Sequence, residues 1–275
     1  MERTVIQKVQ GMPAIDGAGV HLVRVLGRGT VKSFDPFLML DSFDSQNPAD
    51  YTAGFPMHPH RGIETISFLS QGGMTHSDSL GFEDSITSGE VQWMTAGSGI
   101  LHEEKIPAAP RMLGLQMWLN MPEKDKMSKP SYKAIKKEEI KEIPIEGGTL
   151  RLLAGDYKEH KGYKGNYLPL IYYHILLNKG AELTLDVPED YTAFVFTLLG
   201  NAEVAGNKVN EKTAALTSQG DTLTIKAPES DIQIMFAASK KLNESVAWGG
   251  PIVMNTEDEL RQAFAELRDG TFLDN

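Results

Sequence analysis

Three histidines and two glutamates lie in two short segments, at spacings that would let them share one site. His58 and His60 are two residues apart, and Glu64 follows four residues later. His102 and Glu104 are also two residues apart. Side chains two residues apart in a β-strand point to the same face. If both segments are strands of one barrel, three imidazoles and one or two carboxylates converge on its interior.

These ligand types suit a divalent transition metal. Imidazole and carboxylate groups bind iron, manganese, nickel, copper or zinc. The chain has no cysteine, so any metal must be held by nitrogen and oxygen. Four protein ligands on a six-coordinate metal would leave two positions open. Such a site suits a substrate and dioxygen, or a bidentate chelator, better than a closed structural role.

The same residues also have a purely structural interpretation. Two histidines beside a proline are commonly part of a polar loop, so His58 and His60 alone are a weak signal. The second cluster, His102 and Glu104, follows a glycine-rich turn and has the same two-residue spacing. It makes a shared metal site the better interpretation. Glu103 is expected to point outward, away from its two neighbours. His76 follows a Gly-Gly pair, and we expect it in a polar surface loop and not among the ligands.

Length and charge limit the classes of protein that the chain could be. Its 275 residues suggest one large domain or two small ones. The 37 acidic residues outnumber the 27 basic ones, and no Lys/Arg-rich stripe compensates, which disfavours direct nucleic-acid binding. No stretch approaches the roughly 18 apolar residues of a membrane helix, and the first residues lack a signal-peptide pattern. We expect a cytoplasmic protein without a membrane partner, and a monomer.

The elements that must position the candidate ligands are mostly short strands. Runs rich in β-branched and aromatic residues recur along the chain, separated by Gly, Pro, Asn or Asp. They cover residues 19–26, 37–43, 64–69, 84–87, 91–95, 113–120, 150–153, 172–177, 182–186, 191–199, 214–216, 221–226 and 231–237. This spacing predicts an all-β barrel or sandwich.

Two segments have a helical pattern. Residues 133–142 form a short charged stretch in the middle of the chain. The clearer pattern begins with a capping box, in which Thr256 and Glu259 can satisfy each other's backbone amides. Apolar residues then recur on one helical face until Gly270. We expect this second segment to be an amphipathic helix packed on the outside of a barrel.

The polar, lysine-rich span 121–148 divides two strand-rich halves of similar length. It contains three prolines and a Gly-Gly pair, as linkers between domains often do. We therefore place a domain boundary near residue 140. The expected units are an N-terminal metal-binding domain over 1–140 and a C-terminal domain over 141–275.

The candidate ligands lie within longer motifs that resemble the pirin family, a branch of the cupin superfamily. These motifs are FPMHPHRGIET at 55–65, VQWMTAGSGILHEE at 91–104, GLQMWLN at 114–120 and GPIVMNT at 250–256. The similarity extends over essentially the whole chain. It implies two cupin barrels (double-stranded β-helices, or jelly rolls) facing each other, with a short C-terminal helix.

The resemblance also implies a ligand set. Pirins hold one iron ion through three histidines and one glutamate, which by motif position are His58, His60, His102 and Glu104. Glu64 occupies the place where many other cupins have their carboxylate ligand, and in pirins it lies near the metal without being the assigned ligand. The C-terminal half contains only two histidines and no HxH motif, which agrees with a second barrel that lacks a metal.

The leading functional interpretation is an enzyme similar to pirins with quercetin 2,3-dioxygenase activity. A flavonol can bind Fe²⁺ through its 3-hydroxyl and neighbouring carbonyl oxygens, and the metal lowers the pKa of that hydroxyl. Glu104 or Glu64 could take the proton as a catalytic base. Dioxygen would then open the ring and carbon monoxide would leave. Manganese, nickel, copper or zinc could replace iron.

Two other interpretations remain open from the sequence. The resemblance also implies a metal-dependent regulatory protein that binds a transcription factor or a metabolic enzyme, and the acidic charge balance favours protein partners over DNA. A third interpretation is another cupin activity, such as an isomerase or a different ring-cleaving oxygenase.

Overall fold

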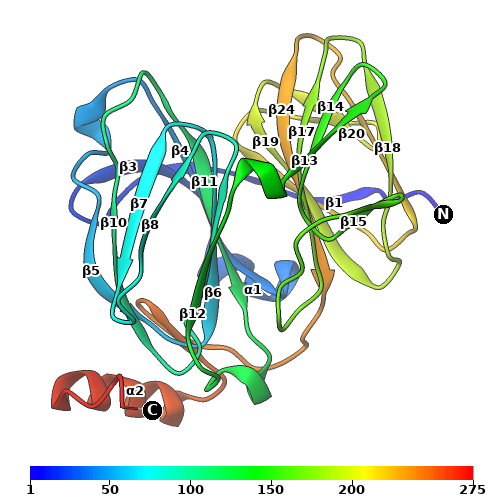
Figure 1. Cartoon of the computed structure of the whole chain (residues 1–275). Coiled ribbons are helices and arrows are strands. Elements are labelled where there is room, and N and C mark those ends of the chain that lie inside the picture. Colours follow the sequence, from blue (N-terminus) through cyan, green and yellow to red (C-terminus); the bar gives the residue numbers. More distant parts are fainter. Residues whose placement is uncertain (275) are drawn as a thin grey trace. The chain divides into compact units, whose positions relative to one another are not determined.

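The computed structural model describes residues 1–274, and strands make up most of it (Figure 1). The chain forms two compact units. We call the first barrel the unit made of Pro13–Leu22, Phe37–Lys136 and the residues from Leu242 onward. We call the second barrel the unit made of Met1–Met12, Val23–Pro36 and Lys137–Lys241. The predicted all-β class is confirmed.

Two antiparallel sheets build the first barrel. The larger sheet has the order β12-β9-β6-β11-β4-β3-β2, and the smaller has the order β5-β10-β7-β8. Their bounds are β2 Met12–Asp16, β3 Val20–Leu26, β4 Phe37–Ser45, β5 Phe55–His60, β6 Ile63–Gln71, β7 Gly73–Asp78, β8 Glu83–Thr87, β9 Val91–Thr95, β10 Ile100–Lys105, β11 Met112–Asn120 and β12 Ser131–Ile135. Buried residues from both sheets, including Phe43, Met74 and Ile86, meet in one core.

The second barrel repeats this two-sheet plan. Its sheets have the orders β1-β22-β19-β24-β17-β14-β13 and β18-β23-β20-β21, and β15 pairs with β16. The bounds are β1 Val5–Gln10, β13 Lys141–Ile145, β14 Gly148–Ala154, β15 Asp156–Tyr157, β16 His160–Lys161, β17 Leu170–Leu177, β18 Glu182–Asp186, β19 Tyr191–Leu199, β20 Ala202–Val204, β21 Asn207–Val209, β22 Thr213–Thr217, β23 Thr222–Lys226 and β24 Ile232–Lys240. Ile175, Val195 and Leu223 belong to its core.

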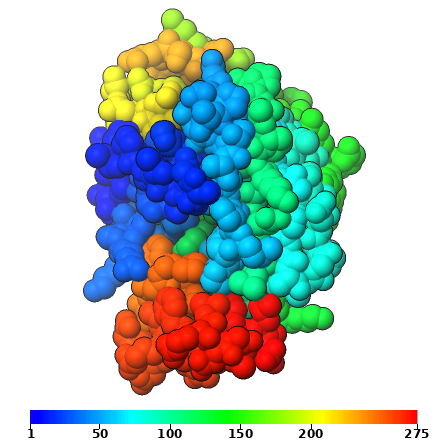
Figure 2. Space-filling model, turned by 90° about the vertical axis from the view of Figure 1, so that its left-hand side faces the viewer, coloured from blue at the N-terminus to red at the C-terminus, as the bar shows by residue number. Residues whose placement is uncertain are grey.

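Helices are few and short. The α-helices are α1 Val31–Phe34 and α2 Glu257–Asp269, and single 3₁₀ turns cover Arg28–Thr30, Pro48–Asp50, Glu123–Asp125 and Lys137–Glu139. The expected capping box of α2 is present, because Thr256 Oγ1 accepts from the Glu259 amide and the Glu259 carboxylate accepts from the Thr256 amide. Gly270 ends the helix with a φ of 77°. Figure 2 shows α2, in red, on the surface beside the orange residues that precede it.

The helix predicted over residues 133–142 is wrong. This stretch contains the end of β12, the turn Lys137–Glu139 and the start of β13. Pro144 lies in β13, which is an edge strand of its sheet, the position at which a proline costs no ladder hydrogen bond. The charged residues of the segment lie mostly in the exposed turn between the two strands and not on a helical face.

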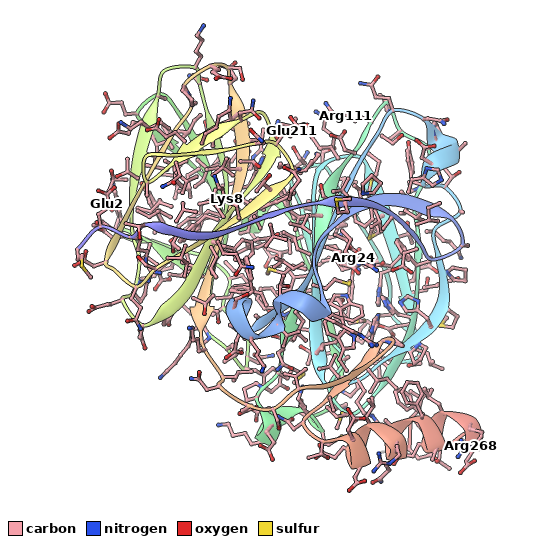
Figure 3. All side chains as sticks on the ribbon, turned by 180° about the vertical axis from the view of Figure 1, so that it is seen from behind. Glu2, Lys8, Arg24, Arg111, Glu211 and Arg268 are labelled. Carbon is pink, nitrogen blue, oxygen red and sulfur yellow. The ribbon has the colours of Figure 1, made fainter. Side chains whose placement is uncertain are left out.

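The two units do not follow a single division of the chain near residue 140. The middle boundary falls at Lys137, but both termini belong to the opposite unit from the one expected by chain order. β1 pairs with β22 of the second barrel, where Figure 3 shows it, in blue, along the yellow strands at Lys8. After residue 241 the chain returns to the first barrel, where β25 Ala247–Gly249 and β26 Ile252–Met254 pair with each other.

No helix among residues 1–274 is long and apolar enough to span a membrane.

Candidate metal centre

The expected histidines lie on two paired strands of the first barrel. β5 and β10 are antiparallel neighbours, with His58 opposite His102 and His60 opposite Ile100. β5 contains two prolines, which its edge position in the sheet permits. Gly62 closes the turn after β5 with a φ of 78°, and a Cβ at this position would lie 2.0 Å from the Val253 carbonyl oxygen. Only glycine can therefore redirect the chain here into β6.

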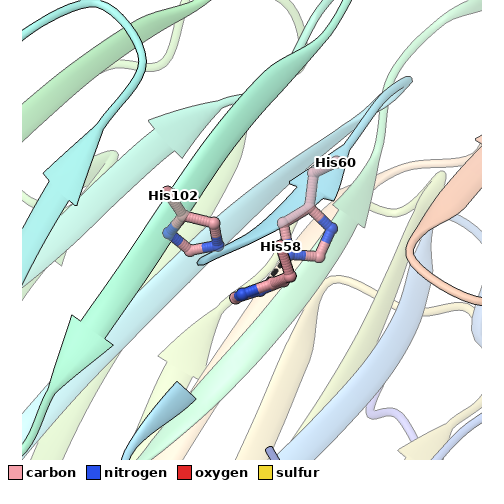
Figure 4. Close-up of side chains that lie close together, drawn as sticks. All are labelled: His58, His60 and His102. Atoms are coloured by element: carbon pink, nitrogen blue, oxygen red, sulfur yellow. Dashed lines mark hydrogen bonds between the residues drawn. The ribbon is translucent and has the colours of Figure 1, made fainter. Parts of the chain in front are cut away.

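The structure brings the three imidazoles together, as predicted (Figure 4). Their ring centroids are 4.3 Å apart for His58 and His102, 4.8 Å for His58 and His60, and 5.0 Å for His60 and His102. One nitrogen of each ring lies within 4.8 Å of the corresponding nitrogen of the other two. His60 and His102 are buried, whereas His58 is half-buried.

Each imidazole engages its Nδ1 atom and leaves Nε2 for another ligand. The Nδ1 atom of His58 lies 2.8 Å from the Pro56 carbonyl oxygen, and that of His60 lies 3.0 Å from the Pro251 carbonyl oxygen. A carbonyl oxygen only accepts, so both Nδ1 atoms donate and both Nε2 atoms carry lone pairs in the neutral rings. The His102 Nε2 atom is buried and has no hydrogen-bond partner among residues 1–274.

The two lone-pair atoms of His58 and His60 face each other. Their Nε2 atoms are 3.1 Å apart, the contact drawn as a dashed line in Figure 4. With both Nδ1 atoms protonated, neither Nε2 can donate to the other, so the contact is repulsive unless a cation lies between them. Two nitrogen ligands at right angles on a metal with bonds of about 2.1 Å are about 3 Å apart. The residues present therefore fit a metal ion.

Electrostatics keep these rings in the form that binds metals. Burial, together with the neighbouring His58, lowers the pKa of His60 to about 3. Burial also lowers the pKa of His102 well below its usual value, with contributions from His60 and His58. A neutral imidazole offers a lone pair and an imidazolium does not, so at neutral pH the buried rings need no deprotonation before a metal binds.

Glu104 is buried next to this group but is not part of it. Its carboxylate accepts from Gln92 Nε2 at 2.6 Å and from Gln116 Nε2 at 3.1 Å. Gln116 in turn accepts from Trp118 Nε1 at 3.3 Å, and the Trp118 ring lies 5.0 Å from the His60 ring. Glu103 is half-buried and pairs with Lys105, so the alternation expected along β10 is present.

Glu64 is also buried and lies outside the three-histidine group. Its Oε1 atom accepts from Trp93 Nε1 at 2.9 Å and from Thr95 Oγ1 at 2.7 Å. Burial raises its pKa, and these two hydrogen bonds partly oppose the increase. The two donors lie on β9, the strand beside Glu64 in the larger sheet.

The prediction that His76 lies at the surface is wrong. His76 is fully buried on β7, where Met74, His76 and Asp78 are buried and the residues between them are half-buried. Its Nδ1 atom lies 3.3 Å from His102 Nδ1, and its Nε2 atom lies 2.7 Å from Asp78 Oδ2. The two-residue spacing of Met74, His76 and Asp78 is what a strand with one buried face would show. The preceding Gly-Gly pair instead favoured a loop.

The two glutamines that hold Glu104 were also missed. Gln92 and Gln116 lie in strands that are buried throughout and mostly apolar. A polar residue at a buried strand position usually has a specific partner. This pattern could have identified both residues.

A separate hollow lies elsewhere, in the second barrel. It has a volume of about 980 Å³, and residues such as Asp156, Tyr167, Tyr173 and Tyr191 line it. The two histidines of this barrel do not lie together in a ligand group. His174 is buried between Arg151 and Gln233, whereas His160 is half-buried beside Glu159.

Two double-sheet barrels, one of which holds three convergent imidazoles, define a bicupin protein with a group that could bind a metal. Comparisons with known proteins agree. The family model described as Pirin matches residues 19–119, and the one described as Pirin C-terminal cupin domain matches residues 172–273. A pirin-like protein of Caulobacter vibrioides is 37% identical over 275 residues, which cover 98% of this chain and 99% of the relative. The chain belongs to the pirin family.

Two further relatives extend this comparison. Human pirin is 35% identical over 261 residues, which cover 92% of this chain and 88% of the relative. A crystal structure of a quercetin 2,3-dioxygenase from Acinetobacter baumannii matches with a TM-score of 0.91 and 33% identity. The match covers 99% of both chains. The bicupin fold expected from the sequence is therefore confirmed.

Proposed function

We propose that the first barrel is a metal-dependent dioxygenase site of the quercetin 2,3-dioxygenase type, with a flavonol and dioxygen as substrates. The observation that carries the proposal is the convergence of three imidazoles, each of which engages its Nδ1 atom elsewhere. The similarity to a bicupin structure named as a quercetin 2,3-dioxygenase supports the reaction type.

In this proposal His58, His60 and His102 are metal ligands and Glu104 is the fourth. Fe²⁺ is the metal we expect, and manganese, nickel, copper or zinc suit the same nitrogen and oxygen donors. When bound, the metal would supply Lewis acidity and lower the pKa of a coordinated flavonol hydroxyl. Gln92 and Gln116 hold the Glu104 carboxylate in one orientation.

The proton of the flavonol 3-hydroxyl needs an acceptor within hydrogen-bond reach. We assign this role to Glu104, because its carboxylate lies on the same face of β10 as His102. Glu64 is the second candidate. Its raised pKa would suit a base, but its Oε1 atom is already engaged by Trp93 and Thr95. Comparing flavonol turnover by Glu104→Gln with flavonol turnover by Glu64→Gln tests which of the two carboxylates is the base.

A turnover assay tests the proposed function. Protein loaded anaerobically with Fe²⁺ is mixed with quercetin in air, and loss of flavonol absorbance is followed together with carbon monoxide release. We expect turnover by the parent protein and by His160→Ala, a variant at a half-buried histidine of the second barrel. We expect none by His102→Ala. Equal turnover by a metal-free His102→Ala protein would contradict the proposal, and an inert metal-loaded parent would favour the regulatory alternative.

A further inference from the structure

A chain of three buried side chains, His102, His76 and Asp78, begins at the three-histidine group and leads away from it. Asp78, His76 and His102 lie on the neighbouring strands β7 and β10, where His102 is the register partner of Asp78. Asp78 Oδ2 is 2.7 Å from His76 Nε2, and His76 Nδ1 is 3.3 Å from His102 Nδ1. The side chains of His76 and Asp78 are completely buried.

The direction of every hydrogen bond in this chain follows from one carboxylate. Ionised Asp78 can only accept, so the proton between the two residues lies on His76 Nε2. In a neutral imidazole the other nitrogen then carries the lone pair, which makes His76 Nδ1 an acceptor. His102 must therefore donate from Nδ1, and its own lone pair lies on Nε2. This is the buried atom that has no partner among residues 1–274.

Neighbouring groups hold Asp78 and His76 in place, and we call these two residues the relay. Asp78 Oδ1 accepts from the Leu80 amide at 2.8 Å and from the Phe82 amide at 3.3 Å, which fixes the rotation of the carboxylate. The Tyr132 ring stacks on His76 with the centroids 4.1 Å apart and the planes 13° apart. The relay is thus built into the barrel wall.

We propose that Asp78 and His76 are positioning residues of the metal centre, which hold His102 in the tautomer with a proton on Nδ1 and aim its Nε2 lone pair at the metal. His58 and His60 obtain the same tautomer from backbone carbonyl groups, whereas His102 obtains it from a side-chain relay. The proposal rests on the metal centre of the proposed function, but not on its substrate. Mutation of a residue that is hydrogen-bonded to a metal ligand typically weakens metal affinity by 10- to 100-fold.

Asp78→Asn is the informative substitution, because it keeps the shape of the side chain and reverses the direction of the two hydrogen bonds in the relay. The two backbone amides require an oxygen at the Oδ1 position, so the side-chain NH₂ group must face His76. His76 would then accept at Nε2 and donate from Nδ1, and His102 would carry its proton on Nε2, where the metal should bind. Asp84→Asn is the matched control, since Asp84 lies on the adjacent strand β8 but pairs with Lys136 at the surface.

Two measurements on the same proteins test the proposal. Calorimetric titration with Ni²⁺ should show a 10- to 100-fold weaker affinity for Asp78→Asn than for the parent, and an unchanged affinity for Asp84→Asn. Spectra of ¹⁵N-histidine-labelled, metal-free protein should show the His102 proton on Nδ1 in the parent and on Nε2 in Asp78→Asn.

The two measurements also separate this inference from the proposed function. A parent protein with the His102 proton on Nε2 would overturn the relay, as would Asp78→Asn with parental tautomer and affinity. An equal loss of affinity in Asp84→Asn would overturn it as well, because the effect would then come from charge alone. Failure to cleave flavonols leaves it unaffected, since neither measurement involves a substrate.

Discussion

At the scale of single residues, the three histidines share one hydrogen-bonding arrangement but obtain it from different parts of the chain. Pro56 supplies the acceptor for His58 from the same strand, and Pro251 supplies that for His60 from a distant segment. His76 supplies the acceptor for His102. Each arrangement leaves Nε2 available, so the fit to a metal depends on three separate contacts.

The first prediction concerns Glu104, the proposed fourth ligand. Glu104→Gln should lower the metal content of purified protein, because it replaces a charged oxygen ligand with a weaker neutral one. Glu103→Gln should leave the content unchanged, since Glu103 is turned away from the site and pairs with Lys105. Elemental analysis of the two variants checks this, and similar losses in both would contradict the assignment of Glu104.

The second prediction concerns Glu64 and pH. Burial raises its pKa in the folded protein above the unfolded value. The folded state therefore binds this proton more tightly, and the contribution of Glu64 to stability is lost as pH rises through the folded pKa. Gln at this position still accepts from Trp93 and Thr95 but does not ionise.

Compared with metal-free Glu64→Gln, the metal-free parent should therefore lose stability as the pH rises above 4.5, the ordinary pKa of this glutamate. Urea unfolding at several pH values measures the difference between the two proteins. A difference that stays constant across the range, or one that changes in the opposite direction, would contradict the raised pKa.

Residues whose orientation depends on local spacing were predictable from the sequence. The alternation within β5 and β10 was enough to select His58, His60, His102 and Glu104 as inward-facing groups. It did not reveal the groups that orient them. Pro251 acts through its backbone carbonyl, which no side-chain pattern records, and it reaches His60 only because the chain returns to the first barrel near its end.

At the scale of elements, the buried Arg61 links the end of β5, which contains His58 and His60, to the C-terminal helix. Its side chain donates to the carbonyl oxygens of Ser98 at 2.5 Å and Phe272 at 3.0 Å, and it pairs with Glu266 of α2 at 2.7 Å. The guanidinium carbon also lies 4.2 Å from the centre of the Phe272 ring. These contacts tie α2 to the turn directly after His60.

The third prediction follows from this link. Arg61→Met removes a buried ion pair and two buried hydrogen bonds, so it should lower the free energy of unfolding by about 3–5 kcal/mol. Arg268→Met is the matched control, because Arg268 pairs with Asp269 at the surface of the same helix. The control should stay within about 0.5 kcal/mol of the parent. Denaturant unfolding measures both, and equal effects would contradict the anchoring role of Arg61.

At the scale of the whole molecule, each barrel is completed by a segment from the far end of the chain. Arg3 shows how the N-terminal segment is held in the second barrel. It is fully buried and donates to the carbonyl oxygens of Pro188, Ser218 and Gly220 at 2.6, 2.8 and 2.8 Å. The strand-rich halves were predictable from local patterns. The packing of each terminal segment in the opposite barrel was not, because pairing between β1 and β22 leaves no local signal.

The fourth prediction uses this separation of the two units. Arg3→Met leaves the carbonyl oxygens of Pro188, Ser218 and Gly220 without this donor. Of these three bonds, only the bond to Gly220 is fully buried, and a buried unsatisfied group costs roughly 1–3 kcal/mol. The variant's free energy of unfolding should therefore fall by about 1–3 kcal/mol. Its metal content should match the parent, because the proposed ligands belong to the first barrel. A fall in metal content in the folded variant would contradict this independence.

The metal stoichiometry of the purified protein tests the central claim most directly. Three imidazoles with free Nε2 atoms in one barrel predict one ion per chain in the parent and in His160→Ala, and none in His102→Ala. Elemental analysis of the three proteins, each loaded with Fe²⁺ anaerobically and then desalted, measures this. One ion per chain in a folded His102→Ala protein, or none in the parent, would contradict the account.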